Sequence, residues 1–135
     1  MSLQPFLVKA HVRVIYGDTD QMGVVYYANY FRYFEFSRSE YFRARGGNYS
    51  ELEKQGYGLP VVQAHADYKA SAKYEDELVI AVHIEELKRA SLEFRYSITK
   101  KSDETLLCTG HTIHACVGSN GRAARMPQSL IDLLK

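Results

Sequence analysis

The sequence predicts a single α+β domain, residues 1–135, in which antiparallel strands pack against one long helix. Residues 28–45 contain no glycine or proline and have aromatic side chains at helical spacing. After this stretch, runs of apolar residues, one of them strictly alternating with polar residues, are separated by short polar segments, which is typical of strands that pair with antiparallel neighbours. A length of 135 residues suits one compact domain with one core.

The long helix is predicted to be largely wrapped by the rest of the protein. Its aromatic residues recur at spacings of three, four and seven, and its polar residues form only a narrow stripe. Asn29 is expected to cap its first turn, and Gly46-Gly47 to end it. The aromatic residues are Tyr30, Phe31, Phe34, Tyr41 and Phe42, and the polar stripe is Arg32, Glu35, Ser39 and Arg43.

Five strands and a second, short helix complete the predicted fold. The strands are expected near residues 12–16 and over residues 59–68, 78–87, 92–99 and 105–117, with the short helix over residues 127–134. Such an element order favours a sheet curled around the single long helix. One helix covers only one face of a five-stranded sheet, so we expect the other face or an edge to meet another subunit.

Composition excludes several classes of function. Seventeen basic and sixteen acidic residues give a formal charge of +1, which offers no general attraction to nucleic acid or an anionic membrane. No apolar run approaches the ~20 residues of a membrane span, and residues 1–9 lack the pattern of a secretory signal. We therefore expect a cytoplasmic protein with no stable membrane insertion.

The cysteines and histidines predict neither a disulfide nor a metal site. Cys108 and Cys116 fall in one predicted strand, where eight steps of ~3.3 Å would place them roughly 26 Å apart, beyond disulfide reach. The predicted absence of a disulfide within the chain fits a reducing compartment. The five histidines show no zinc-ligand spacing, and we expect no metal and no cofactor.

The segment Tyr16–Tyr30 contains the candidate catalytic residues. It places Asp18 and Asp20 in a loop just before the N-terminus of the long helix, where free backbone N–H groups and the positive end of the helix dipole gather. A carboxylate beside N–H groups that can polarise a carbonyl is a minimal arrangement for hydrolysis. The alternative is that both aspartates only shape a turn and cap the helix, which is common for this residue type.

The pattern Tyr-x-Asp-Thr-Asp-x-x-Gly-Val-Val-Tyr, followed by an aromatic residue and Ala-Asn-Tyr, resembles the 4-hydroxybenzoyl-CoA thioesterase family of hotdog-fold acyl-CoA thioesterases. It is especially similar to the branch that includes the Tol–Pal-associated thioesterases. The similarity continues through residues 34–38, 66–68, 74–78 and 89–92. It implies the hotdog fold, a five-stranded antiparallel sheet wrapped around the long helix, paired into homodimers and often homotetramers.

The resemblance also implies roles for particular residues. The family's catalytic carboxylate maps to Asp20, and its backbone oxyanion donor maps to the N–H of Tyr27, where the Tol–Pal-associated branch usually has histidine. Basic groups are needed near the CoA phosphates, and Lys88-Arg89 matches a nucleotide-side region of the family. The alternative for these two cations is ordinary solvated charge in a turn. The expected substrate contacts are Gly23, Val24, Lys88, Arg89 and Ser91.

The predicted activity is hydrolysis of a short-chain or aromatic acyl-CoA thioester. Asp20 serves as nucleophile or as general base, and the sequence leaves both open. One alternative is a non-catalytic acyl-CoA binder or an envelope-associated scaffold protein. A dehydratase of the same fold is disfavoured. A sequence that resembles those enzymes would contain a histidine followed soon by Pro-Gly, and this sequence has no such segment.

Overall fold

The computed structural model describes residues 6–47 and 49–135 and contains a five-stranded antiparallel sheet in the order β1-β3-β4-β5-β2. This confirms the predicted α+β class and the sheet with one long helix, α1. The strands are β1 (Val8–Arg13), β2 (Val61–Tyr68), β3 (Glu77–Leu87), β4 (Ser91–Lys100) and β5 (Leu106–Ala115). The helices are α1 (Asn29–Ala44), α2 (Tyr49–Lys54) and α3 (Gln128–Leu134), with a short 3₁₀ turn at Tyr16–Asp18.

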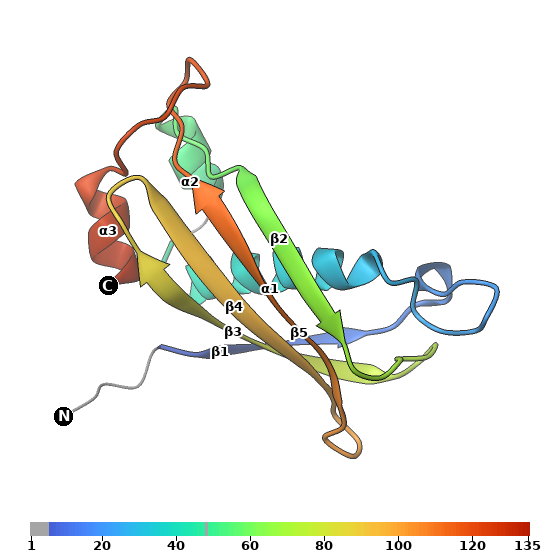
Figure 1. The fold of residues 1–135 in the computed structure, drawn as a ribbon. Coiled ribbons are helices and arrows are strands. Elements are labelled where there is room, and N and C mark those ends of the chain that lie inside the picture. Colours follow the sequence, from blue (N-terminus) through green and yellow to red (C-terminus); the bar gives the residue numbers. More distant parts are fainter. Residues whose placement is uncertain (1–5, 48) are drawn as a thin grey trace.

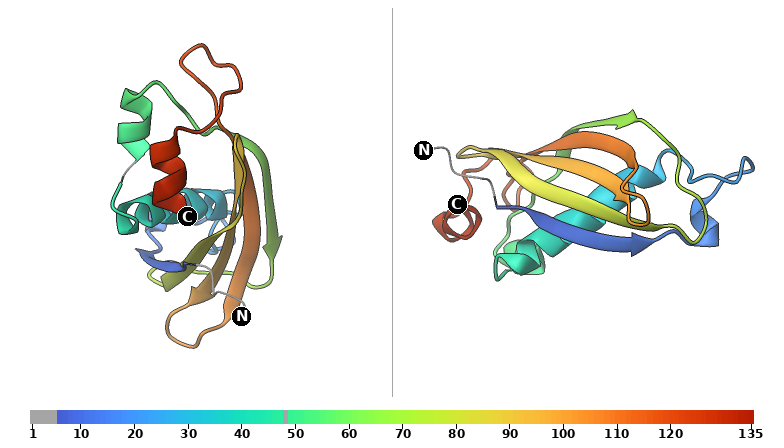
Figure 2. Two further views of the ribbon diagram at one scale, coloured as in Figure 1. Left: turned by 90° about the vertical axis from the view of Figure 1, so that its left-hand side faces the viewer. Right: turned by 90° about the horizontal axis from the view of Figure 1, so that it is seen from below.

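The sheet curves around α1, and α2 and α3 lie on the same side of the sheet as α1 (Figures 1 and 2). In β4, Leu92, Phe94, Tyr96 and Ile98 are buried toward the helix, and the residues between them are more exposed. The ring of Phe34 in α1 stacks on Tyr96 at 4.2 Å between centroids. Aromatic burial of this kind is a large part of the stability of a small core. The core therefore lies between α1 and the concave face of the sheet.

The first strand begins earlier than the sequence pattern predicted. β1 ends at Arg13, and Tyr16 lies in the 3₁₀ turn that follows. The shift has a physical cause, because β1 pairs with β3 from Val8 opposite Val82 to Arg13 opposite Glu77. After that point the backbone of Val14 bonds instead to the segment before β3.

The start of α1 also differs from the prediction. The residue at the N-cap position is Ala28, and no side chain caps the helix there. The Asn29 side chain instead donates a hydrogen bond to the backbone oxygen of Asp18 at 2.9 Å. The asparagine therefore ties the preceding loop to the helix, and the first helix amides donate to backbone oxygens of the preceding turn instead of to a side chain. The short helix α2 was not predicted, because six residues are too few to show helical periodicity.

Both cysteines, Cys108 and Cys116, are free and buried. No helix in residues 6–47 and 49–135 is long and apolar enough to cross a membrane.

A close approach between β5 and its neighbours predicts that Gly110→Ala destabilises the fold. A methyl group at this position would lie 2.4 Å from the backbone oxygen of His65 and 2.8 Å from the Phe34 ring. We expect a loss of about 1–3 kcal/mol or more in the free energy of unfolding, measured by urea denaturation. Gly17→Ala is the control, because a methyl group there meets nothing within 4 Å. Equal stability of the two variants would contradict this packing.

Candidate active site

The segment that carries the two aspartates forms a small hairpin directly before α1. The amide of Tyr26 donates to the backbone oxygen of Asp18, and the amide of Asp20 donates to that of Val24, both at 2.9 Å. Gly23, with φ at +79°, closes the turn, a backbone conformation that favours glycine. Figure 1 shows this loop extending beyond one end of the sheet.

Asp18 is the structural aspartate of the pair. Its side chain is buried and forms an ion pair with Arg32, and the hydroxyl of Tyr33 donates to its Oδ2 at 2.8 Å. Burial and this hydrogen bond raise the pKa of Tyr33 well above its ordinary value, so the tyrosine remains a donor. Because both partners belong to α1, Asp18 fixes the hairpin against the first turn of the helix.

Asp20 is the aspartate that remains available for chemistry. Its side chain is half-buried, and its Oδ1 accepts a hydrogen bond from the amide of Met22 at 2.8 Å. Its Oδ2 accepts no hydrogen bond from any residue that the structure describes. Interaction with Tyr27 raises the pKa of Tyr26, and the charge of Asp20 raises it further.

Two backbone amides directly before α1 are open. Asn29 and Tyr30 donate to backbone oxygens of the turn before them, but within the described chain the N–H groups of Tyr27 and Ala28 donate to none. Tyr27 is fixed by its own carbonyl, which accepts a hydrogen bond from the hydroxyl of Tyr68 at 3.0 Å. The helix N-terminus therefore presents free donors on the same loop as Asp20, an arrangement suited to an anion or a polarised carbonyl.

The predicted site residues fall into two groups at opposite ends of the sheet. Asp20, Gly23, Val24 and Tyr27 lie by the start of β3, where Val24 forms a bridge with Lys73. The other group, Lys88, Arg89 and Ser91, forms the turn after β3, in which the amide of Lys88 donates to the oxygen of Ser91 at 2.8 Å. Since β3 has 11 residues at about 3.3 Å each, roughly 30 Å separates the two groups in one chain.

β2 is an edge strand that the other described residues leave uncovered. Seven of its eight residues are exposed, and the eighth, Ala66, is half-buried. Val61, Val62 and Tyr68 are 45%, 57% and 44% exposed, and they belong to the larger apolar side chains on the surface. An unpaired edge with exposed apolar residues is a template for pairing with another strand.

A cavity of about 250 Å³ lies between α1 and the segment that leads into β2. Behind it runs a buried chain of hydrogen bonds, from Arg38 to the hydroxyl of Tyr96 (3.2 Å), then to Thr112 (2.6 Å) and to Nε2 of His114 (2.8 Å). Nδ1 of His114 donates to the oxygen of Leu59 at 2.9 Å. A carbonyl only accepts, so Nδ1 of His114 carries a proton, and burial lowers the pKa of His114 to about 4, so the ring is neutral at pH 7. Its Nε2 then accepts from Thr112, which accepts from Tyr96, which accepts from Arg38.

The sequence did not predict this chain of hydrogen bonds. Tyr96 and His114 lie on strands expected from apolar patterns, and Arg38 lies on the predicted helix, but nothing in a linear pattern shows that these side chains meet. Only a general rule could have indicated it, namely that a polar side chain on a buried strand face requires a hydrogen-bond partner. In residues 6–47 and 49–135, no group of three or more His, Cys, Asp or Glu side chains is placed to hold a metal ion.

An antiparallel sheet curved around one long helix is the fold of the hotdog thioester hydrolases that the sequence resembles. Residues 14–134 match the thioesterase-like superfamily. The chain therefore belongs to this superfamily, which confirms the predicted family and fold.

Individual relatives agree with this assignment. A putative esterase of Aquifex aeolicus is 32% identical over 97% of this chain and 98% of its own length. The acyl-CoA thioesterase YbgC of Haemophilus influenzae is 36% identical over 78% of this chain and 77% of its own length. Among solved structures, 4-hydroxybenzoyl-CoA thioesterase of Pseudomonas sp. strain CBS-3 has a TM-score of 0.85 at 28% identity, covering 94% of this chain and 98% of that one.

The neutral state of His114 predicts a specific pH dependence of stability. Burial lowers its pKa to about 4 in the folded protein, from an ordinary value of 6.5. The unfolded chain therefore binds the extra proton first, and stability is lost as the pH falls from about 6.5 toward 4. We expect this group to contribute a loss of about 3 kcal/mol, measured by urea unfolding at several pH values.

In His114→Gln this part of the pH dependence should disappear, whereas His65→Gln, at an exposed position, should retain it. A pH profile that is identical in wild type and His114→Gln would contradict a neutral, buried His114.

Proposed function

We propose that this protein hydrolyses the thioester of a short-chain or aromatic acyl-CoA, with Asp20 as the catalytic carboxylate. The observation that carries the proposal is the half-buried Asp20, with one oxygen uncommitted, on the loop that leads to the open amides of Tyr27 and Ala28. These are the two groups that thioester hydrolysis requires: one to attack or to activate water, and one to stabilise the oxyanion.

Two routes are compatible with this arrangement. In the first, the Asp20 carboxylate attacks the thioester carbon, CoA leaves as the thiolate, and water hydrolyses the resulting mixed anhydride. In the second, Asp20 takes a proton from a water molecule that attacks the same carbon, and CoA again leaves. In both, the Tyr27 N–H donates to the carbonyl oxygen as it becomes negative, and Gly23 and Val24 line the turn beside the substrate.

Exposed aromatic side chains favour an aromatic acyl group. The rings of Tyr26 and Tyr27 lie 4.7 Å apart, and Tyr27 and Tyr68 make an edge contact at 6.3 Å, next to the proposed oxyanion donor. Such surfaces can stack on an aryl ring. Two similar solved proteins are named a 4-hydroxybenzoyl-CoA thioesterase and a gentisyl-coenzyme A thioesterase. A structure of the former, with an aspartate replaced by asparagine, is complexed with 4-hydroxybenzoyl-CoA.

The proposed site is shared between two copies of the chain. If β2 pairs with β2 of a second copy around a two-fold axis, the partner strand runs in the opposite direction. The turn after the partner's β3 then lies at the same end as Asp20. Counted from the Tyr68 end of β2, to which the carbonyl of Tyr27 is bonded, that turn lies four strand spacings of about 4.8 Å away, or roughly 20 Å, across the joined sheet. A homodimer, or a homotetramer built from such dimers, would thus bring the two groups of predicted residues together.

In this arrangement, Lys88 and Arg89 of the partner subunit bind the CoA phosphates, and Ser91 of the partner subunit contacts the same part of the substrate. Arginine suits phosphate through its paired donors, and lysine through its concentrated charge. The two free, buried thiols fit a reducing compartment, so we place the enzyme in the cytoplasm.

The second candidate function is acyl-CoA binding without catalysis, as in a scaffold protein. It would use the cations but would not need a carboxylate at position 20. Release of free thiol from a panel of short, aromatic and long acyl-CoAs distinguishes the two, because only a hydrolase produces thiol.

Replacing Asp20 by asparagine should abolish most of the hydrolysis without unfolding the protein. The amide oxygen of Asn can still accept the Met22 hydrogen bond, so the hairpin is retained, but the group no longer attacks or takes a proton. We expect kcat to fall by about 10²–10⁴-fold with CoA binding preserved. Asp132→Asn, on the exposed part of α3, is the matched control. Turnover near the wild-type value in D20N would refute the assignment.

A charge on β2 should separate the two copies and reduce activity. Val62→Glu adds a charge to the exposed edge of both strands, and Val62 is 57% exposed in the single chain, so its own fold should persist. We expect a shift from dimer to monomer in analytical ultracentrifugation, together with loss of hydrolysis. Ser50→Glu, also at an exposed position but outside β2, should retain both. A monomeric wild type with full activity would contradict the shared site.

A further inference from the structure

The hydroxyl of Tyr68 reaches from the end of β2 to the turn directly before α1. It donates a hydrogen bond to the backbone oxygen of Tyr27 at 3.0 Å. The backbone amide of Tyr30 donates to the same oxygen over a longer distance, 3.3 Å. The shorter bond to this carbonyl therefore comes from a side chain of the edge strand and not from the helix itself.

The carbonyl of Tyr27 and the N–H of Ala28 belong to the same planar peptide group. A hydrogen bond that a carbonyl accepts polarises its peptide group, and the N–H of that group becomes a stronger donor, by about 10–30% per bond. This N–H donates to no acceptor among the residues that the structure describes. Tyr68 therefore acts on one of the two open amides before α1.

Both open amides lie in the turn that leads into α1. The amides of Asn29, Tyr30 and Phe31 each donate to the backbone oxygen of the residue three positions earlier, and Ala28 has helical angles, with φ at −66° and ψ at −22°. N–H groups in the first turn of a helix have no partner within it and face outward from its end. One negatively charged oxygen can therefore accept from the amides of both Tyr27 and Ala28.

The fold holds the Tyr68 side chain in place and keeps its hydroxyl protonated. Its backbone pairs with Cys108 of β5, and its ring contacts that of Tyr30 at 5.4 Å between centroids. Burial raises the pKa of Tyr68 above its ordinary value. The hydroxyl therefore remains a hydrogen-bond donor to Tyr27 across the neutral pH range.

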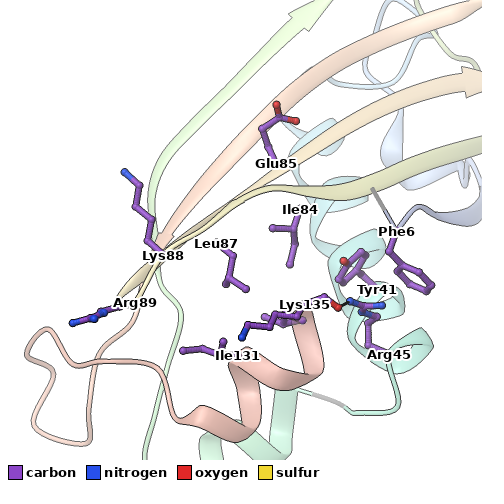
Figure 3. Close-up of a pocket in the computed structure, with 11 residues that line it drawn as sticks. Phe6, Tyr41, Arg45, Ile84, Glu85, Leu87, Lys88, Arg89, Ile131 and Lys135 are labelled. Atoms are coloured by element: carbon purple, nitrogen blue, oxygen red, sulfur yellow. Dashed lines mark hydrogen bonds between the residues drawn. The ribbon is translucent and has the colours of Figure 1, made fainter. Parts of the chain in front are cut away.

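The groove at the opposite end of the sheet does not suit the reacting carbonyl. Figure 3 shows Leu87 and Ile131 on its wall and the side chains of Lys88 and Arg89 pointing away from them, which suits the proposed contact of these cations with CoA phosphates. An apolar wall does not stabilise a developing negative charge. The oxyanion donors therefore belong to the amides before α1, on the loop that carries Asp20.

We propose that the Ala28 N–H is a second donor to the oxyanion, beside the Tyr27 N–H, and that Tyr68 is the positioning residue that holds and polarises its peptide group. The inference rests on the proposed hydrolysis and adds a residue of β2 to it. As the thioester carbon is attacked, its oxygen gains negative charge and both N–H bonds strengthen. The Tyr68 hydroxyl acts only through the peptide group, so its effect falls on kcat and not on KM.

Tyr68→Phe removes the hydroxyl and retains the ring. With benzoyl-CoA as substrate, we expect kcat to fall by about 5–10-fold, less than the ~10²–10³-fold that follows loss of a direct oxyanion donor, and KM to stay within about 2-fold. Tyr74→Phe is the matched control. Tyr74 is exposed, its ring contacts only that of Tyr16, and its hydroxyl has no hydrogen-bond partner among the described residues. Its kcat should equal that of the wild type.

Infrared difference spectroscopy separates polarisation from a purely structural effect. Benzoyl-CoA that carries a heavy carbon isotope at the thioester carbonyl is added in saturating amounts to D20N, which turns it over slowly. We expect the carbonyl band to lie at lower frequency than in free benzoyl-CoA, because hydrogen-bond donors weaken the C=O bond. In D20N combined with Tyr68→Phe the band should return part of the way, and in D20N combined with Tyr74→Phe it should not move.

The inference is overturned if kcat of Tyr68→Phe equals that of Tyr74→Phe, whatever happens to KM. It is also overturned if the carbonyl band in D20N is not shifted from that of free benzoyl-CoA, or is the same with and without the Tyr68 hydroxyl. The band is read without hydrolysis, so the two proposals fail separately. A wild type that releases no thiol would refute the hydrolysis, and the band would still decide whether Tyr68 polarises the amide of Ala28.

Discussion

Strand direction in the antiparallel sheet determines which side chains of this chain can lie close together. β3 runs from the hairpin that carries Asp20 to the turn that carries Lys88 and Arg89, so the two groups are fixed at opposite ends of a rigid element. No side-chain rotation or loop movement of ordinary size closes a gap of roughly 30 Å. The proposed shared site, and the role of the uncovered edge strand β2, both follow from this constraint.

A second constraint acts at the scale of one loop. The buried Asp18 joins the hairpin to Arg32 and Tyr33 of α1, and Asn29 holds the same residue by its backbone oxygen. Both carboxylate oxygens of Asp18 therefore have a partner in α1. Asp20, two residues later, has one oxygen left over. Two aspartates in one short motif thus have different environments, one suited to structure and one suited to chemistry, because only Asp18 bonds to side chains of α1.

Much of the fold could be predicted from the sequence because the helix and strands depend on local patterns of apolar and polar residues. The alternation in β4 and the aromatic spacing in α1 follow from burial on one face, which periodicity reports directly. The start of β1 and the cap of α1 were predicted wrongly, because partners distant in sequence decide them: β3 sets the register of β1, and Asp18 takes the side chain of Asn29.

The candidate site was less accessible to sequence reasoning. Motif resemblance indicated Asp20, Tyr27, Lys88 and Arg89, but it could not show that a single chain keeps them apart. Nor could it show the buried chain from Arg38 to His114, since its members come from one helix and two strands. Their contact is a property of the packed sheet, not of any segment.

The most direct test of the shared site is complementation between two defective chains. D20N retains its cations, and a chain with Lys88→Gln and Arg89→Gln retains its carboxylate. In a mixed dimer, one of the two sites would combine the intact Asp20 of one chain with the intact cations of the other. If the account is correct, mixing the two variants restores hydrolysis at low acyl-CoA concentration to well above that of either alone. Activity that never exceeds the sum of the separate variants, in samples shown to contain mixed dimers, would contradict it.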